Sequence, residues 1–134
     1  MHNLWNFWRQ NDGASALEFA LVLPLFATML FGTIHMGIAY YYAGSVQYAL
    51  ERTARLTMVD QDMSATQVQT AFDNEVSVFT DQSIVVNYSV DTSGDVPIAA
   101  LNATYAYEVI VPFVPAFTLT FDAQARVPLE PTPS

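Results

Sequence analysis

The hydrophobic positions of this chain change their spacing twice, and the first pattern is an uninterrupted apolar run from Phe19 to Tyr42. No Asp, Glu, Lys or Arg lies between Glu18 and Glu51. A helix of about 24 residues covers roughly 36 Å, and a bilayer core needs only about 20 such residues. The run ends in Tyr40, Tyr41 and Tyr42, rings that favour a membrane–water interface. The pattern predicts one membrane-spanning helix near the amino terminus.

Helical spacing continues beyond the apolar run, so one helix is predicted over residues 14–58, with its second half projecting out of the membrane. Glu51 and Arg55 are four residues apart with the acid first, which predicts an ion pair along the helix. The apolar stripe of this second half consists of Val46, Ala49, Leu50, Thr53 and Leu56.

A second, amphipathic helix is predicted over residues 65–79. Ser64 and Gln67 have the spacing of a capping box, in which each side chain bonds the backbone of the other residue. The residues at helical spacing after this box are Val68, Ala71, Phe72, Val76 and Phe79.

From Ile84 onward the hydrophobic period falls from 3.6 to 2, which indicates half-buried strands. Three alternating runs lie around residues 84–90, 101–111 and 117–127, joined by a turn at residues 92–95 and by a short connection between Pro112 and Pro115. We therefore expect an α+β fold, in which the second helix packs on a three-stranded antiparallel sheet. Residues 59–134 would form this small domain.

The net charge of the chain comes from the predicted domain, because the three acidic and three basic residues before Val59 cancel. From Val59 onward there are ten acidic residues and one basic residue, Arg126, and the whole chain has a net charge of -9. Such a surface repels phosphate backbones, so no nucleic-acid partner is expected. Cysteine and lysine are absent, which removes disulfides, thiolate metal sites and Schiff-base chemistry.

The same residues give no catalytic constellation. No histidine follows His35, so serines of the domain lack a base. We expect no enzyme activity, no metal, no cofactor and no small-molecule substrate.

Several residues of the apolar run bear on helix packing. Pro24 removes a backbone donor and is expected to kink or loosen the helix near Phe19 and Ala20. Small residues recur at Thr28 and Gly32, at Ala39 and Ala43, and at Gly37 and Gly44. The first two pairs have the four-residue spacing that lets neighbouring membrane helices approach closely.

Glu18 is the one acid at the start of the apolar run. A carboxylate costs about 2.5–3.5 kcal/mol at a bilayer centre and less near its edge. Either it reaches the headgroups, or it pairs with a cation in an assembly. No Lys or Arg lies nearby in sequence, so such a cation, for example a free amine, would come from another chain.

The sequence from Gly13 to Pro24, GASALEFALVLP, resembles the start of TadE-like pseudopilins of the tight-adherence (Tad, Flp) pilus, with Glu at the fifth position after a small residue. Their later A-x-x-x-A-R-like segment is matched by ALERTAR, Ala49 to Arg55, and their carboxyl-terminal strands by FTLTFDAQARV. The resemblance implies a prepilin-type leader over residues 1–13, cut by a prepilin peptidase between Gly13 and Ala14. Glu18 would then neutralise the new amine of a neighbouring subunit at Ala14, or set the register of its own helix.

The resemblance further implies a minor pilin needed to assemble a Tad/Flp-type pilus, by priming or at the tip. Its partners would be the prepilin peptidase, other pilins and pseudopilins, an inner-membrane assembly platform and the lipid bilayer. We expect a bacterial inner-membrane protein with a cytoplasmic amino terminus and a periplasmic domain. The protein could also be incorporated into a surface pilus.

Two alternatives remain open. The chain can be a single-pass periplasmic binding or scaffold module that never enters a filament. A secretory signal peptide is less favoured, because the apolar stretch exceeds the usual 7–15 residues and contains Glu18 near its start.

Overall fold

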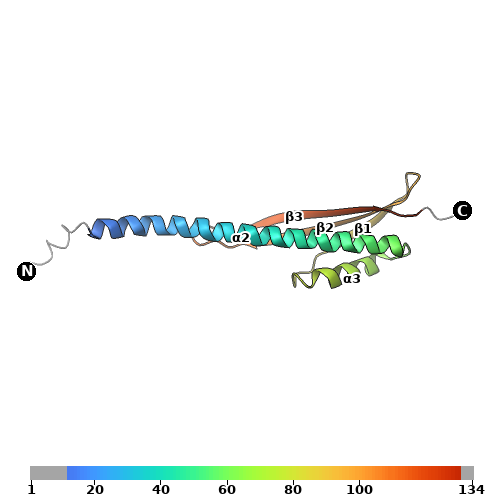
Figure 1. The fold of residues 1–134 in the computed structure, drawn as a ribbon, viewed down its shortest axis with the longest axis horizontal. Helices are drawn as coiled ribbons and strands as arrows, with labels where there is room; N and C mark the ends of the chain where they lie inside the picture. Colours follow the sequence, from blue (N-terminus) through green and yellow to red (C-terminus); the bar gives the residue numbers. More distant parts are fainter. Residues whose placement is uncertain (1–11, 131–134) are drawn as a thin grey trace, which may run out of the picture. The chain divides into compact units, whose positions relative to one another are not determined.

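The computed structural model describes residues 12–130 and contains two helices and one sheet in this range (Figure 1). The elements are α2 (Asp12–Val59), α3 (Ala65–Val76), β1 (Val86–Asp91), β2 (Ile98–Val109) and β3 (Phe117–Pro128). The order of a long apolar helix, a short helix and three strands confirms the predicted α+β class.

The chain forms two compact units, and the helix α2 contributes to both. The first unit holds the helix up to Gly37 together with residues 108–117, the connection between β2 and β3. The second unit comprises Ile38–Tyr107 and Thr118–Ser134. The sequence places a boundary at residue 59, where the helix ends. The compact unit that holds most of the sheet begins earlier, at Ile38.

α2 is a single α-helix of 48 residues that continues through Pro24. The hydroxyl of Thr28 donates a 2.8 Å hydrogen bond to the carbonyl of Pro24, and Thr33 does the same to Met29. The predicted loosening around Pro24 therefore does not end the helix. Its bounds differ by one or two residues from the predicted 14–58.

α3 begins at the predicted capping box. The Ser64 hydroxyl accepts a hydrogen bond from the Gln67 N–H, and the Gln67 side-chain oxygen accepts one from the Ser64 N–H at 2.8 Å. The helix ends at Val76, three residues before the predicted end at Phe79. The Ser77 hydroxyl donates to the carbonyl of Asn74, a side-chain contact that competes with the helical pattern at this end.

The sheet has the order β1-β2-β3, so consecutive strands are neighbours, as the predicted meander requires. β1 and β2 are antiparallel, with Val86 opposite Ala103 and Asp91 opposite Ile98. Between β2 and β3, the Thr104 hydroxyl donates to the Asp122 carboxylate at 2.9 Å on the polar face. The predicted alternation of apolar and polar positions is confirmed along β2 and most of β3.

One hydrophobic core occupies the second unit, and both helices contribute to it. From α2 it takes Val46, Ala49, Leu50 and Ala54; from α3 Val68, Phe72 and Val76; from the strands chiefly Val86, Ala99, Leu101, Ala103, Tyr105, Ala123 and Ala125.

The second half of α2 therefore packs into the domain core. The sequence predicts that this half leaves the membrane, but it assigns the cover of the sheet to α3 and not to α2. The predicted stripe is also wrong at its end, because Leu56 is exposed and Ala54 and Thr57 are fully buried instead. Thr57 can be buried because its hydroxyl bonds the carbonyl of Ala54 within the helix.

Candidate functional site: the apolar segment of the long helix

The first half of α2 exposes a continuous series of large apolar side chains. In water each would lose the stabilisation that burial gives, about 25 cal/mol per Å² of apolar surface. An exposed series of this length marks a surface for lipid or for other helices. α2 is also long and apolar enough to cross a membrane, as predicted. The exposed side chains are Leu17, Phe19, Leu21, Val22, Leu23, Leu25, Phe26, Met29, Leu30, Phe31, Ile34, Met36 and Ile38.

Gly13 and Ala14, the predicted processing site, lie in the first turn of α2 and are exposed. Of the predicted leader, residues 1–11 lie outside the described residues. A peptidase reaching the Gly13–Ala14 bond would meet a helix start, where the first N–H groups have no intrahelical partner and fraying is easiest. Cleavage at this bond stays a prediction.

Glu18 lies one turn beyond Ala14 and is exposed. Among residues 12–130 no side chain pairs with its carboxylate. The three arginines of this range, Arg52, Arg55 and Arg126, belong to the other compact unit. The described part of the chain thus leaves the Glu18 carboxylate available to a cation of another molecule, and that role stays a prediction.

The small residues predicted to pack against other helices fall into two environments. Gly32 and Gly37 lie in open positions, since a Cβ added to either would meet no atom within 4 Å. Ala39 is fully buried within this chain, and Thr28 and Ala43 are half-buried. This chain itself therefore does not require a glycine at position 32 or 37, and packing between subunits at these positions stays a prediction.

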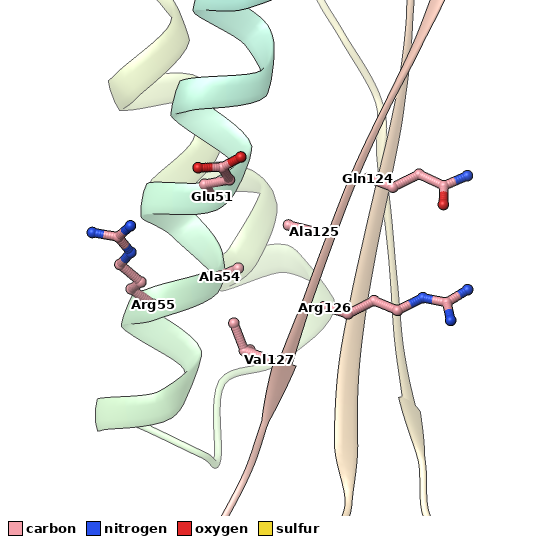
Figure 2. Close-up of a pocket in the computed structure, with 7 residues that line it drawn as sticks. All are labelled: Glu51, Ala54, Arg55, Gln124, Ala125, Arg126 and Val127. Carbon is pink, nitrogen blue, oxygen red and sulfur yellow. The ribbon is translucent and has the colours of Figure 1, made fainter.

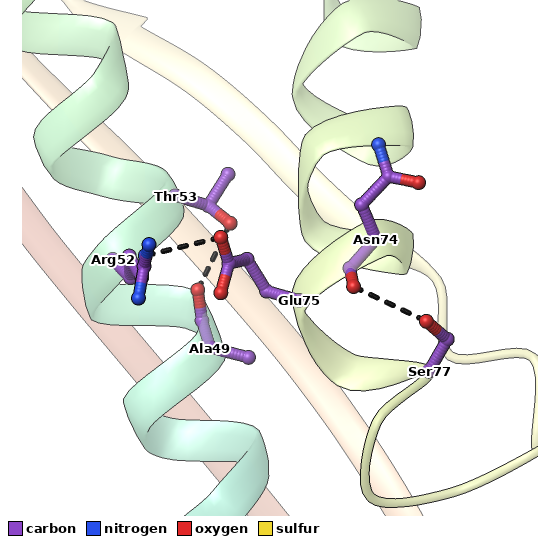
Figure 3. A network of polar contacts seen from close by, with 6 residues as sticks. All are labelled: Ala49, Arg52, Thr53, Asn74, Glu75 and Ser77. Atoms are coloured by element: carbon purple, nitrogen blue, oxygen red, sulfur yellow. Dashed lines mark hydrogen bonds and ion pairs between the residues drawn. The ribbon is translucent and has the colours of Figure 1, made fainter.

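The predicted ion pair between Glu51 and Arg55 is wrong. The Glu51 carboxylate accepts a 2.8 Å hydrogen bond from Gln47, while Arg52 pairs with Glu75 of α3 at 3.0 Å (Figure 3). The Arg52 side chain is more than half exposed, so this bridge adds only about 0–1 kcal/mol. It links α2 to α3 within the second unit. Sequence spacing along one helix could not indicate a partner on another.

A hollow of about 290 Å³ lies between α2 and β3 in the second unit (Figure 2). It is lined from α2 by Glu51, Ala54 and Arg55 and from β3 by Ala125 and Val127. Gln124 and Arg126 also border it, but their side chains point away from the helix, on the other face of the sheet. In the range 12–130, no group of three or more His, Cys, Asp or Glu residues could hold a metal ion.

Sequence reasoning missed the connection between β2 and β3 as a functional feature. We call residues 109–117, VIVPFVPAF, the apolar tip, because none of their side chains is polar. In the first unit the Thr28 hydroxyl shares its one proton between the Pro24 carbonyl at 2.8 Å and the Pro112 carbonyl at 3.3 Å, and the longer contact joins the tip to the apolar helix. The signal was the uninterrupted run of apolar residues between Glu108 and Thr118.

The family model described as TadE-like protein matches residues 13–55. The matched residues extend from the predicted processing site through the exposed apolar series to the buried turns of α2. Comparison with curated proteins and with solved structures gave no significant match. The family match supports a pilin-like protein associated with the Tad pilus. Residues 13–55, about a third of the chain, match the TadE-like family model, which confirms the resemblance that the sequence motifs in this range indicate.

Proposed function

We propose that this protein is a minor pilin or pseudopilin with no enzymatic activity, which helps to assemble a Tad/Flp-type pilus by priming it or capping its tip. α2 holds the protein in the bacterial inner membrane as a single span, with the amino terminus in the cytoplasm and the domain in the periplasm. On assembly, contacts with other pilin helices replace contacts with lipid.

The observation that carries this proposal is the combination of a TadE-like segment with an exposed apolar helix that has one acid near its start. Helices in lipid associate through close packing of side chains and through polar contacts rather than through release of water. The open positions at Gly32 and Gly37 permit close packing, and Glu18 supplies the polar contact. Its partner would be the α-amine that cleavage leaves on Ala14 of another subunit.

The first test is the amino terminus of the protein in its native membrane. Processing by a prepilin peptidase predicts a mature chain that begins at Ala14, and intact-mass spectrometry measures it directly. A bulky Gly13 substitution, Gly13→Val, should prevent cleavage while leaving membrane insertion unchanged. If every wild-type molecule keeps its first 13 residues, the proposal is contradicted, and a permanently anchored periplasmic scaffold becomes the better description.

The second test concerns Glu18. Glu18→Gln keeps the shape of the side chain but removes the charge, so it should reduce recovery of the protein with sheared pili without lowering its amount in the membrane. Glu51→Gln is the matched control, because Glu51 is an exposed acid on the same helix whose partner is the local Gln47. Equal recovery of the two variants in the pilus fraction would argue against an intermolecular pair at Glu18.

A further inference from the structure

Most side chains of the apolar tip are exposed, and only Val109 and Val111 are buried. Ile110, Phe113, Val114 and Phe117 are all exposed, and Phe113 is 77% exposed. A soluble connection between two strands would carry polar turn residues. Instead, nine consecutive residues without a polar side chain are bounded by Glu108 and Thr118.

The backbone at the tip is also suited to a water-free environment, where each unpaired N–H or C=O costs several kcal/mol. Pro112 and Pro115 have no N–H to satisfy. The Val114 N–H bonds the Val111 carbonyl at 3.2 Å, and the Pro112 carbonyl accepts from the Thr28 hydroxyl. Two N–H groups are therefore absent from the tip, and one further N–H and two carbonyls are paired.

Phe113 occupies a backbone conformation that favours glycine. Its φ is 67°, and it follows Pro112 in a turn closed by the Val114 N–H, as the third residue of a type II turn does. A bulky side chain is uncommon there and strains the backbone. Because the ring is mostly exposed, contacts within this chain do not account for an aromatic residue at this position.

The length of the tip matches the depth available beside α2. With Glu18 at one headgroup layer, Thr28 lies ten residues further, roughly 15 Å, which is about the middle of a 30 Å hydrocarbon core. From Glu108 to Pro112 and Phe113 an extended chain advances about 13–16 Å. Glu108 therefore lies at the level of the headgroup layer opposite to that of Glu18, while Pro112 and Phe113 lie at the depth of Thr28.

We propose that the apolar tip inserts into the outer leaflet beside α2, with Phe113 and its apolar neighbours in contact with lipid acyl chains. The protein then enters the bilayer with two elements, a helix that crosses it and a hairpin tip that enters one leaflet. This inference rests on the membrane span of the proposed function but not on assembly into a filament.

Tryptophan fluorescence in vesicles with brominated acyl chains tests the inference on the full chain. The natural Trp5 and Trp8 are replaced by Phe, and one Trp is introduced at a time, by Phe113→Trp or Ile110→Trp in the tip. Two tip positions are used because tryptophan at a left-handed position can disturb the turn. Phe26→Trp in the exposed helix series is the positive control, and Val96→Trp, exposed in the turn between β1 and β2, is the control for water.

We expect the tip tryptophans to lose most of their emission to bromine and to emit at shorter wavelength, as Phe26→Trp does. Emission from both tip positions like that of Val96→Trp, with Phe26→Trp still quenched, would overturn the inference and leave the proposed anchor intact. Absence of quenching at Phe26→Trp would contradict the anchor as well. A short-wavelength emission without quenching that strengthens at higher protein-to-lipid ratio would show that a second copy covers the tip, which also overturns insertion into lipid.

Discussion

The side-chain oxygen of Gln69, on α3, accepts a 2.8 Å hydrogen bond from the backbone N–H of Val86 at the start of β1. The amide nitrogen of the same side chain donates to the Ile84 carbonyl at 2.9 Å. β1 is an edge strand, so one side of its backbone has no neighbouring strand. Gln69 takes the place of a neighbouring strand at the entry to β1 and thereby fixes the strand against α3.

Gln69→Ala should lower the free energy of unfolding by about 1–3 kcal/mol, because it leaves two partly buried backbone groups unpaired. Thermal unfolding followed by circular dichroism in detergent measures the loss. Asn74→Ala, an exposed position on the same helix, is the matched control and should shift the transition little. A loss no greater than that of the control would show that water replaces the amide at no cost.

Phe72 is the largest fully buried side chain of the structure between residues 12 and 130. Phe72→Ala should destabilise the domain by about 3–5 kcal/mol, since it removes apolar contacts and leaves a cavity. Val78→Ala, at a 78% exposed position just after α3, should change stability by less than about 0.5 kcal/mol. Denaturant unfolding of both variants gives the comparison, and similar midpoints would contradict a core centred on Phe72.

The buried phenol of Tyr105 leads us to expect that the folded domain loses stability at alkaline pH. Burial raises the pKa of the Tyr105 phenol above its ordinary value, with smaller contributions from Tyr42 and Tyr107. A raised pKa in the folded state means that the neutral phenol stabilises the fold, fully below the unfolded pKa of about 10. This stability is lost as the pH rises from there through the folded pKa.

The midpoint of thermal unfolding between pH 8 and 12 checks this prediction, and Tyr105→Phe should flatten its alkaline decline. Phe121→Leu, which removes an aromatic ring but no titratable group, is the control for the loss of packing alone. Tyr88, whose pKa is also raised by burial, should account for part of the decline that remains. An identical alkaline slope in wild type and Tyr105→Phe would contradict the assignment.

Local rules predicted the elements well. The capping box at Ser64 and Gln67 set the start of α3 because both of its hydrogen bonds lie within four residues. Alternation along residues 101–109 placed Leu101, Ala103 and Tyr105 on the buried face because side chains of a strand point to opposite sides in turn. The ion pair of Arg52 was missed because its partner, Glu75, lies on another helix.

In the candidate site, too, the features with a local sequence pattern were predicted and those that depend on distant residues were missed. Gly13, Ala14, Glu18 and the exposed apolar series were found from the sequence, because their pattern lies within one continuous helix. The apolar tip was read only as a connection bounded by prolines. Its relation to the helix depends on Thr28 and Pro112, which are 84 positions apart, and no local pattern links them.

The sequence by itself determined that an apolar helix precedes an amphipathic helix and three alternating strands, because hydrophobic period and capping act over a few residues. Only the tertiary structure decided that the second half of α2 joins the domain core and that residues 108–117 belong with the first half. An apolar stripe shows that a face must be covered, but the covering surface depends on how the chain folds back. Whether water, lipid or protein covers such a face therefore depends on contacts between residues that are far apart in the sequence.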